Sequence, residues 1–357
     1  MTMTKAEAVQ RIVSEPREVA PGQPVEIGRF RPEDAWGVAR VFHAIYGDGY
    51  PVDVVYVPER LIAANADGTT VSVVARVPSG DVVGHAALYR SSAPHPGLQE
   101  LGQWAVIPAY RGGILALRIQ QILLDKIAPT LPVDAIYGEA VTNHTIPQKV
   151  SGILGCNDTG IEVDLMPEGA LAREGAPDRV SVVMVTRTFH DRPQRLFVSP
   201  VYLDTARFLV EGCGIDRTLE ESTAAPPPGS KSALAATSYA GAGVLRVDLS
   251  SVGADLDGEA AALEARADRE GLPVRQLFVS LHEPWAGHAA AVFRPRGYFL
   301  AGYFPRWFDH DALVLQKLTH APGFDRIKLY RERAFRLLEL VREDHRAVRA
   351  LAAAPRA

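Results

Sequence analysis

Residues Tyr110–Ile119 read YRGGILALRI, which places an arginine and two glycines directly ahead of an apolar helical run. A glycine in a helix interior costs roughly 1 kcal/mol relative to alanine, so a pair at a helix start needs an explanation. The first turn of a helix has unpaired backbone N–H groups and the positive end of the helix dipole. Glycines leave those groups open to an anion, as in phosphate-binding helix starts. A plain helix cap with glycines that ease the turn is the alternative.

The segments on both sides of this helix alternate between strand and helix patterns. In chain order we expect β-α-α-β-β-β-α-β-α-β-β over residues 25–30, 31–45, 58–66, 70–77, 81–89, 98–107, 110–128, 135–141, 144–154, 159–166 and 179–189. Strands and helices in this order are typical of an α/β fold with a mixed sheet.

A second series of strands and helices follows a proline-rich break at residues 220–239, which we interpret as a loop or linker. Val141-Thr142-Asn143-His144 ends a strand of the first half, and Val279-Ser280-Leu281-His282 ends a strand of the second. A helix, a glycine and two strands follow each of them, so the pattern indicates a duplication, with chance similarity as the alternative. The second half has no arginine–glycine helix start.

Composition narrows the class of protein and its partners. The chain has 357 residues, a formal net charge of −4 and no long basic run, so nucleic acid is a poor partner. Two cysteines give neither a disulfide framework nor a zinc spacing, and we expect no metal site. No apolar stretch of about 18 residues predicts a membrane span, and the polar N-terminus lacks the core of a signal peptide. We therefore expect a cytoplasmic protein, with residues 1–23 as a loosely held arm.

The stretch Ala105–Gly112, AVIPAYRG, resembles the signature of the GNAT superfamily of acyl-CoA N-acyltransferases. In that family a strand reading V-x-P precedes Y-R-G-x-G-I-G at the start of a helix. The resemblance covers about residues 25–189 and implies a mixed-sheet GNAT-like fold, here in tandem. It implies a GNAT-like domain at 22–190 that binds acyl-CoA and a degenerate GNAT-like domain at 191–355 that ends in a helix.

The resemblance also implies acetyl-CoA as the acyl donor and assigns residues to it. Val106 would pair with pantetheine through its backbone, and Asn143 would lie near the thiol end of the coenzyme. The residues implied around the pyrophosphate are Arg111, Gly112, Gly113, Ile114, Leu115 and Ala116.

Two departures from the family pattern concern the coenzyme and the general acid. The second glycine stands one place early, so Ile114 occupies a position where the family has a small residue. Many members have a tyrosine, four residues before the glycine of the following helix, that protonates the departing thiolate. Here that position is Ser151, and Cys156 replaces the usual aromatic residue after the glycine.

Acyl transfer to an amine needs a base, because an ammonium must lose its proton before it attacks. Glu100 lies six residues before Val106, at a position where the family often has its base. Even spacing puts the two on the same side of an ideal strand, although a bulge would break that parity. Glu139 is the second candidate, because a carboxylate in an apolar strand usually has a partner or a function. A solvent-facing Glu100 and a hydrogen-bonded, structural Glu139 are the alternatives.

Together these patterns predict an N-acetyltransferase that moves an acetyl group from acetyl-CoA to a primary amine of a small molecule. The amine would attack directly in a ternary complex, and the turn holding Tyr46, Asp48 and Tyr50 would bind it. The alternatives are a non-catalytic module that binds acyl-CoA or a partner protein, and an acyltransferase that uses acyl carrier protein. The acceptor, the acyl chain length and the oligomeric state stay open.

Overall fold

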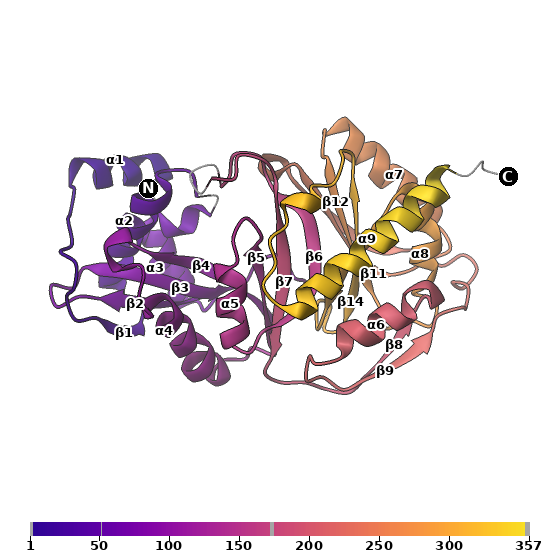
Figure 1. Ribbon diagram of the computed structural model, residues 1–357, viewed down its shortest axis with the longest axis horizontal. Helices are drawn as coiled ribbons and strands as arrows, with labels where there is room; N and C mark the ends of the chain where they lie inside the picture. Colours follow the sequence, from indigo (N-terminus) through magenta and orange to yellow (C-terminus); the bar gives the residue numbers. More distant parts are fainter. Residues whose placement is uncertain (1–2, 51, 172–174, 354–357) are drawn as a thin grey trace. The chain divides into compact units, whose positions relative to one another are not determined.

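The computed structural model describes residues 3–50, 52–171 and 175–353, and its chain forms two compact units. Unit 1 contains the chain up to Ser92 together with Gln99–Ile136. Unit 2 contains Ala93–Leu98 and the chain from Tyr137 onward. Figure 1 labels the helices and strands of both units.

Unit 1 is a four-stranded antiparallel sheet in the order β1-β2-β3-β4, with helices on both faces. Helix α2 covers one face, where the Phe42 ring meets the His85 ring at 5.6 Å. Helix α4 covers the other, where a Cβ on Gly84 would lie 2.7 Å from Ile119. The elements are α1 (Lys5–Ser14), β1 (Glu26–Arg29), α2 (Ala35–Tyr46), α3 (Pro58–Ala66), β2 (Thr70–Arg76), β3 (Val82–Tyr89), β4 (Leu98–Val106) and α4 (Leu115–Gln121), which continues as a π-helix over Ile122–Ile127.

Part of the expected N-terminal arm is a helix, so that expectation was wrong. Helix α1 begins at a capping box, in which Thr4 accepts from the Glu7 N–H and Glu7 accepts from the Thr4 N–H. The T-x-x-E pattern that marks such a helix start is present in the sequence. Ala8 and Ile12 are buried, so packing stabilises the helix as well.

A β-bulge in β4 separates the faces of the two residues that ideal spacing placed together. Gly102 pairs with Ala87, whereas Ala105 pairs with His85, so β4 has one extra residue in this interval. Glu100 lies opposite Tyr89, on the face that α2 covers, and Val106 lies opposite Gly84, on the face of α4. The expectation that Glu100 and Val106 share one side of the strand is therefore wrong, because a bulge reverses the alternation of side chains.

His85 anchors the bulge from inside unit 1. Its Nδ1 lies 2.7 Å from the carbonyl oxygen of Gln103, the bulge residue with φ of 50°. A carbonyl can only accept, so Nδ1 donates and Nε2 accepts from the Ser72 hydroxyl at 2.9 Å. Complete burial lowers the pKa of His85 to about 4, which keeps the ring neutral.

We expect the stability of the protein to fall in acid because of His85. Its folded pKa of about 4 lies below the ordinary value of 6.5, so the unfolded chain binds the proton more readily. The stabilising effect is complete above pH 6.5 and is lost as the pH falls toward 4. Urea unfolding at pH 7 and pH 4.5 gives the unfolding free energy that is lost on acidification. This loss should be roughly 2 kcal/mol smaller in His85→Gln than in the parent. The control His190→Gln changes an exposed histidine and should lose as much as the parent, and an equally large loss in His85→Gln would contradict the role of His85.

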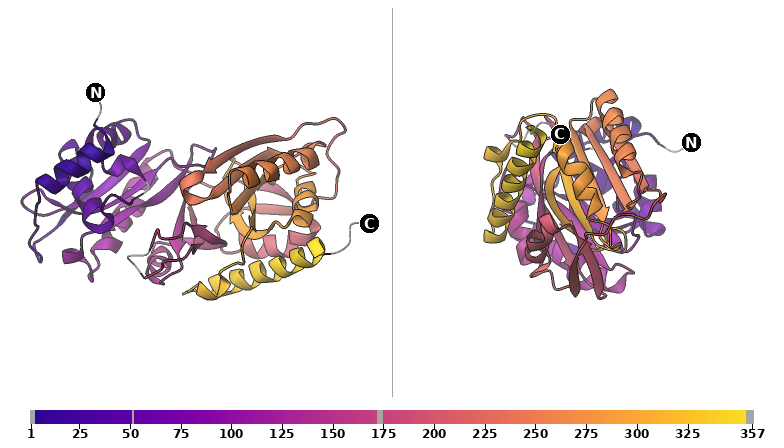
Figure 2. Two further views of the ribbon diagram at one scale, coloured as in Figure 1. Left: turned by 90° about the horizontal axis from the view of Figure 1, so that it is seen from above. Right: turned by 90° about the vertical axis from the view of Figure 1, so that its right-hand side faces the viewer.

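Unit 2 holds a mixed sheet in the order β5-β7-β6-β13-β14-β12-β11-β10 and a two-stranded sheet of β8 and β9. Helix α9 packs on β6 and β13, and Figure 2 shows α7 across the sheet from it. The strands are β5 (Ala135–Val141), β6 (Asn157–Met166), β7 (Val180–Thr188), β8 (Gln194–Val198), β9 (Arg217–Glu221), β10 (Ala233–Tyr239), β11 (Val244–Ser251), β12 (Val274–Ser280), β13 (Phe299–Phe304) and β14 (Ala312–Leu318). The helices are α5 (Ile146–Ile153), α6 (Leu203–Val210), α7 (Leu256–Arg269), α8 (His288–Phe293) and α9 (Glu332–Ala353).

The expected α/β fold with a mixed sheet is confirmed, since β11 and β12 run parallel among antiparallel pairs. The break expected at 220–239 is corrected, because its last third forms β10 and pairs with β11. This strand was not predicted because its residues are mostly small, with few of the large apolar residues that mark a strand in the sequence.

The topology repeats, as the sequence pattern indicated. In unit 2, β5-α5-β6-β7 gives the strand order β5-β7-β6, and β12-α8-β13-β14 gives β12-β14-β13. An antiparallel pair followed by a helix comes before each set: β3 and β4 with α4, and β10 and β11 with α7. This is the tandem arrangement that the resemblance implied.

The two repeats meet where β6 pairs with β13. Gly160 lies opposite Gly302, and a Cβ on either would come within 2.6 Å of atoms of the other repeat. The boundaries 22–190 and 191–355 follow the repeats rather than the compact units, and they stay a prediction; residues 354 and 355 lie outside the described part.

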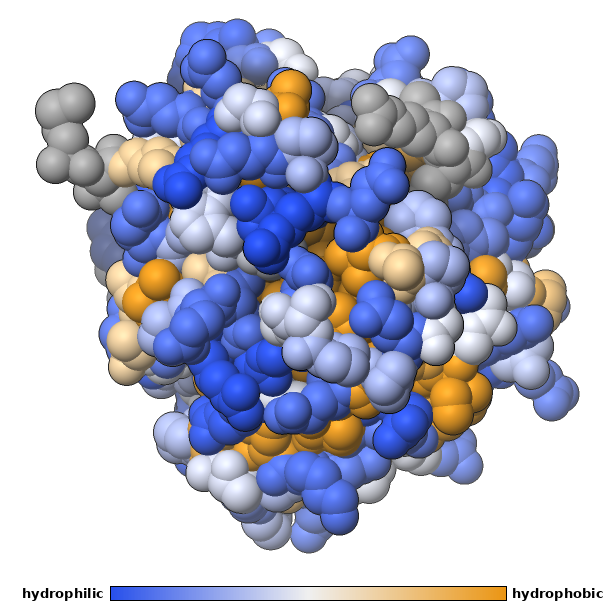
Figure 3. All heavy atoms as spheres, turned by 90° about the vertical axis from the view of Figure 1, so that its left-hand side faces the viewer, coloured by the Kyte–Doolittle hydropathy of each residue, from blue (hydrophilic) through white to orange (hydrophobic). Residues whose placement is uncertain are grey.

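Figure 3 shows a mostly hydrophilic face with several patches of hydrophobic residues between the polar side chains. Within the described residues, no helix is long and apolar enough to cross a membrane.

Candidate functional site

The helix start that the sequence singled out has open backbone N–H groups in unit 1. A 3-10 turn at Pro108–Tyr110 leads to Arg111, and Gly112 has φ of 88° before α4 begins at Leu115. Among the described residues, none forms a hydrogen bond with the N–H groups of Gly112 to Ala116. Five consecutive donors at the positive end of a helix dipole are therefore available to an anion.

The glycines do not serve packing within the chain. A Cβ on Gly112 or Gly113 would meet no atom within 4 Å. The positive φ explains Gly112, because residues with a side chain rarely adopt it. Gly113 has neither a positive φ nor a close neighbour, so nothing in the chain itself requires a glycine there. A ligand that approaches the backbone would require it.

Two side chains flank these N–H groups, and one is held by a hydrogen bond while the other is exposed. The Nε of Arg111 donates to the carbonyl oxygen of Val106 at 2.9 Å, which fixes the guanidinium beside the end of β4. Ile114, the departure from the family pattern, is 67% exposed, so its side chain points away from the core. The isoleucine side chain therefore does not pack over the backbone N–H groups.

In the second repeat, backbone N–H groups ahead of the corresponding helix, α7, are already hydrogen-bonded within the chain. In the loop that leads to α7, which begins at Leu256, the Val252 N–H donates to the Glu283 carboxylate at 3.0 Å and the Gly253 N–H donates to the Ser232 hydroxyl at 3.0 Å. The Ala254 N–H donates to the Ser230 carbonyl oxygen at 3.1 Å. The chain itself supplies the acceptors, a carboxylate included, that a pyrophosphate would otherwise provide.

Glu100 lies among tyrosines on the α2 face of unit 1. The Tyr89 hydroxyl donates to its carboxylate in a short hydrogen bond. The Tyr50 ring lies 4.8 Å from the Phe42 ring in a tilted contact, and burial, then Tyr46 and Glu100, raise the pKa of Tyr50. Glu100 is thus not a plain solvent-facing carboxylate. Sequence reasoning named Tyr46 and Tyr50 but missed Tyr89.

Glu139 and Asn143 belong to unit 2. Glu139 is in β5, and its carboxylate lies 3.8 Å from a guanidinium nitrogen of Arg246. Burial lowers the pKa of Arg246, but the charges of Glu162 and Glu139 outweigh it and raise the pKa. This ion pair favours the structural alternative for Glu139. Asn143 lies in the turn between β5 and α5.

The position of the family's tyrosine acid holds a hydroxyl that is already engaged. The Ser151 hydroxyl donates to the Pro147 carbonyl oxygen at 2.8 Å, one turn earlier in α5. Cys156, which follows Gly155, is buried. The Ser151 hydroxyl already donates its proton within α5.

No protein-family model matches the chain, and no curated protein does. Similar solved structures include a putative acetyltransferase of the GNAT family from Desulfovibrio desulfuricans, with 19% identity, a TM-score of 0.36, and coverage of 46% of this chain and 99% of that one.

Two further neighbours have named acceptors. The ribosomal-protein-S18-alanine N-acetyltransferase from Escherichia coli has 14% identity, a TM-score of 0.37, and coverage of 47% of this chain and 95% of its own. A spermidine N-acetyltransferase from Vibrio cholerae has 13% identity, a TM-score of 0.37, and coverage of 46% and 93%. Each neighbour aligns with slightly less than half of this chain. The function proposed below therefore rests on the geometry of the chain itself.

Proposed function

We propose that this protein is an N-acetyltransferase that moves an acetyl group from acetyl-CoA to a primary amine of a small molecule. The five open N–H groups from Gly112 to Ala116 are the observation that carries the proposal. They suit a pyrophosphate in number, in sequence and in their place at a helix start. Arg111 adds a positive charge whose position the Val106 carbonyl fixes.

The coenzyme binds only to the first repeat in this proposal. The loop ahead of α7 supports it, because the N–H groups of Val252 and Gly253 already donate to Glu283 and Ser232. The thioester supplies an activated acetyl group, and the chain has to bind it, orient the amine and remove a proton. Asn143 is assigned to the thiol end of the coenzyme, following the family pattern.

Glu100 is the general base, acting through water on the attacking ammonium. The Tyr89 hydroxyl donates to this carboxylate and orients it on the α2 face of unit 1. The turn that holds Tyr46, Asp48 and Tyr50 binds the acceptor. Glu139 stays the second candidate, with its pairing to Arg246 favouring a positioning role.

A module that binds acyl-CoA without turnover is the second candidate function. The engaged hydroxyl of Ser151 favours it, because the thiolate would leave without a proton donor from that position. Transfer from acyl carrier protein instead of acetyl-CoA is the other enzymatic alternative. The two classes differ in whether thiol is released.

The test is thiol release from acetyl-CoA by the full chain with a panel of primary amines that includes polyamines, amino sugars and arylalkylamines. Mass spectrometry of the amines should show a gain of one acetyl group. Calorimetry with CoA should give one site per chain. CoA binding without product for any amine would favour the module, and the absence of CoA binding would overturn both readings.

A further inference from the structure

Unit 2 has a pocket of about 400 Å³ outside the carboxyl ends of two parallel strands. Ser250 lies near the end of β11 and Ser280 ends β12, so both reach the same edge of the sheet. The β13–β14 loop at Phe308–His310 and the segment Pro94–Pro96 supply the other walls. Ligands of α/β proteins commonly bind beyond such strand ends.

The β13–β14 loop has a conformation that its residue types disfavour. Arg306 and Asp309 have φ of 61° and 69°, a region that residues with a Cβ rarely adopt. The buried carboxylate of Asp311 holds the loop by accepting from the Arg306 N–H at 2.8 Å. Arg217 and Tyr303 also donate to Asp311 in short bonds. Such over-determined strain is concentrated at functional sites.

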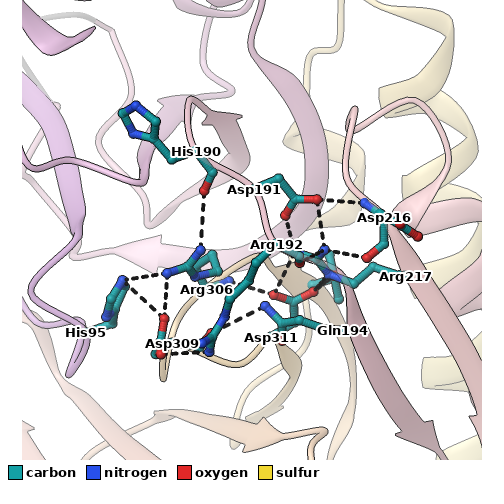
Figure 4. Close-up of polar contacts among 11 residues, drawn as sticks. His95, His190, Asp191, Arg192, Gln194, Asp216, Arg217, Arg306, Asp309 and Asp311 are labelled. Carbon is teal, nitrogen blue, oxygen red and sulfur yellow. Dashed lines mark hydrogen bonds and ion pairs between the residues drawn. The ribbon is translucent and has the colours of Figure 1, made fainter.

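The charged groups around the loop neutralise one another. Figure 4 shows Arg192 and Arg306 converging on Asp309, with distances of 2.7 Å and 2.5 Å to its two carboxylate oxygens. Neither arginine lines the pocket, and the lining includes no lysine. The lining does include the Asp309 carboxylate, which disfavours an anionic ligand.

Two imidazoles form a flat polar surface in the pocket. The rings of His282 and His310 stack at 4.6 Å with 23° between their planes. The Ser280 hydroxyl lies 2.9 Å from Nδ1 of His282. Burial, then the neighbouring His282 and Arg192, lower the pKa of His310, so the ring is neutral at pH 7. Within the described part of the chain, the ring nitrogens of His310 have no hydrogen-bond partner.

We propose that this pocket binds a small, uncharged aromatic molecule that carries a hydroxyl or a ring N–H. Phe308 and the two prolines offer apolar surface to the ring, and His310 offers an unpaired donor and acceptor. Most of the lining residues are polar, and this combination of apolar surface with hydrogen-bonding side chains suits an aromatic ring that also carries a polar group. The site is independent of the proposed acetyl transfer, so binding can be measured without turnover.

Phenol is the probe, with cyclohexanol and benzoate for comparison, and saturation-transfer NMR on the full chain is the measurement. We expect phenol to bind more tightly than cyclohexanol, which lacks the aromatic ring, and than benzoate, which is charged. His310→Ala should weaken phenol binding at least tenfold. His43→Ala, a histidine of α2 in unit 1, is the matched control and should bind phenol as the parent does.

A second variant keeps the test decisive if His310→Ala fails to fold. Ser250 is exposed at the rim, so Ser250→Trp should fold and obstruct the pocket, with loss of the phenol signal. Phenol affinity equal to that of the parent in Ser250→Trp or in a folded His310→Ala would overturn the proposal. Benzoate binding as tight as phenol binding would overturn the assignment of an uncharged ligand.

Discussion

Replacing Gly113 with aspartate is expected to weaken CoA binding by about 10²-fold while leaving the fold intact. Like charges brought together in a binding site typically cost several kcal/mol, and each 1.4 kcal/mol is a factor of ten. A Cβ at this position meets no atom within 4 Å, so the folded chain accommodates the side chain. The carboxylate would stand beside the five N–H groups and repel a pyrophosphate.

Two further variants separate charge from bulk and from general effects of an added carboxylate. Gly113→Ala adds only a methyl group and should weaken CoA binding by much less than Gly113→Asp. Gly258→Asp introduces the same charge in the first turn of α7, where a Cβ also has open space. Its affinity for CoA should equal that of the parent. Calorimetric titration of the three variants is the measurement, and parental affinity in Gly113→Asp would rule out this helix start as the pyrophosphate site.

The sequence predicted the helix start well because local rules govern it. Gly112, Gly113 and the apolar run after them specify a turn and a helix whose first N–H groups are open, without any distant contact. The order of strands and helices along residues 25–189 also follows, because period and turn residues mark each element. The same local reading could have found α1 through its Thr4–Glu7 capping box.

Features that depend on pairing between distant residues could not be derived in this way. The loop between β3 and β4 is long, so no turn fixes the register that brings Tyr89 opposite Glu100. The bulge at Gln103 adds one residue and reverses the faces of Glu100 and Val106. Contact between Gly160 and Gly302 joins strands 142 positions apart in the sequence, and no composition shift marks it.

Replacing Glu100 with glutamine is expected to lower kcat/KM at pH 7 by about 10²–10⁴-fold, the usual contribution of a general base. The side-chain amide keeps the size and still accepts the Tyr89 hydroxyl through its oxygen, so the surrounding contacts persist. It cannot take a proton from an ammonium. Affinity for CoA should stay at the parental value, because Glu100 lies on the face opposite Val106.

The dependence on pH distinguishes a base from a residue that only shapes the site. Above the pKa of the acceptor the amine is already neutral, so the defect of Glu100→Gln should shrink as the pH rises. Tyr89→Phe keeps the carboxylate and should lose less activity than Glu100→Gln. Glu59→Gln removes an exposed carboxylate of α3 and should match the parent at every pH.

The measurement is kcat/KM from pH 6 to 10 with an amine identified in the acceptor panel. A Glu100→Gln enzyme with the full activity of the parent at pH 7 would exclude Glu100 as the base. A defect of constant size across the pH range would mean that the carboxylate organises the tyrosines rather than removes the proton.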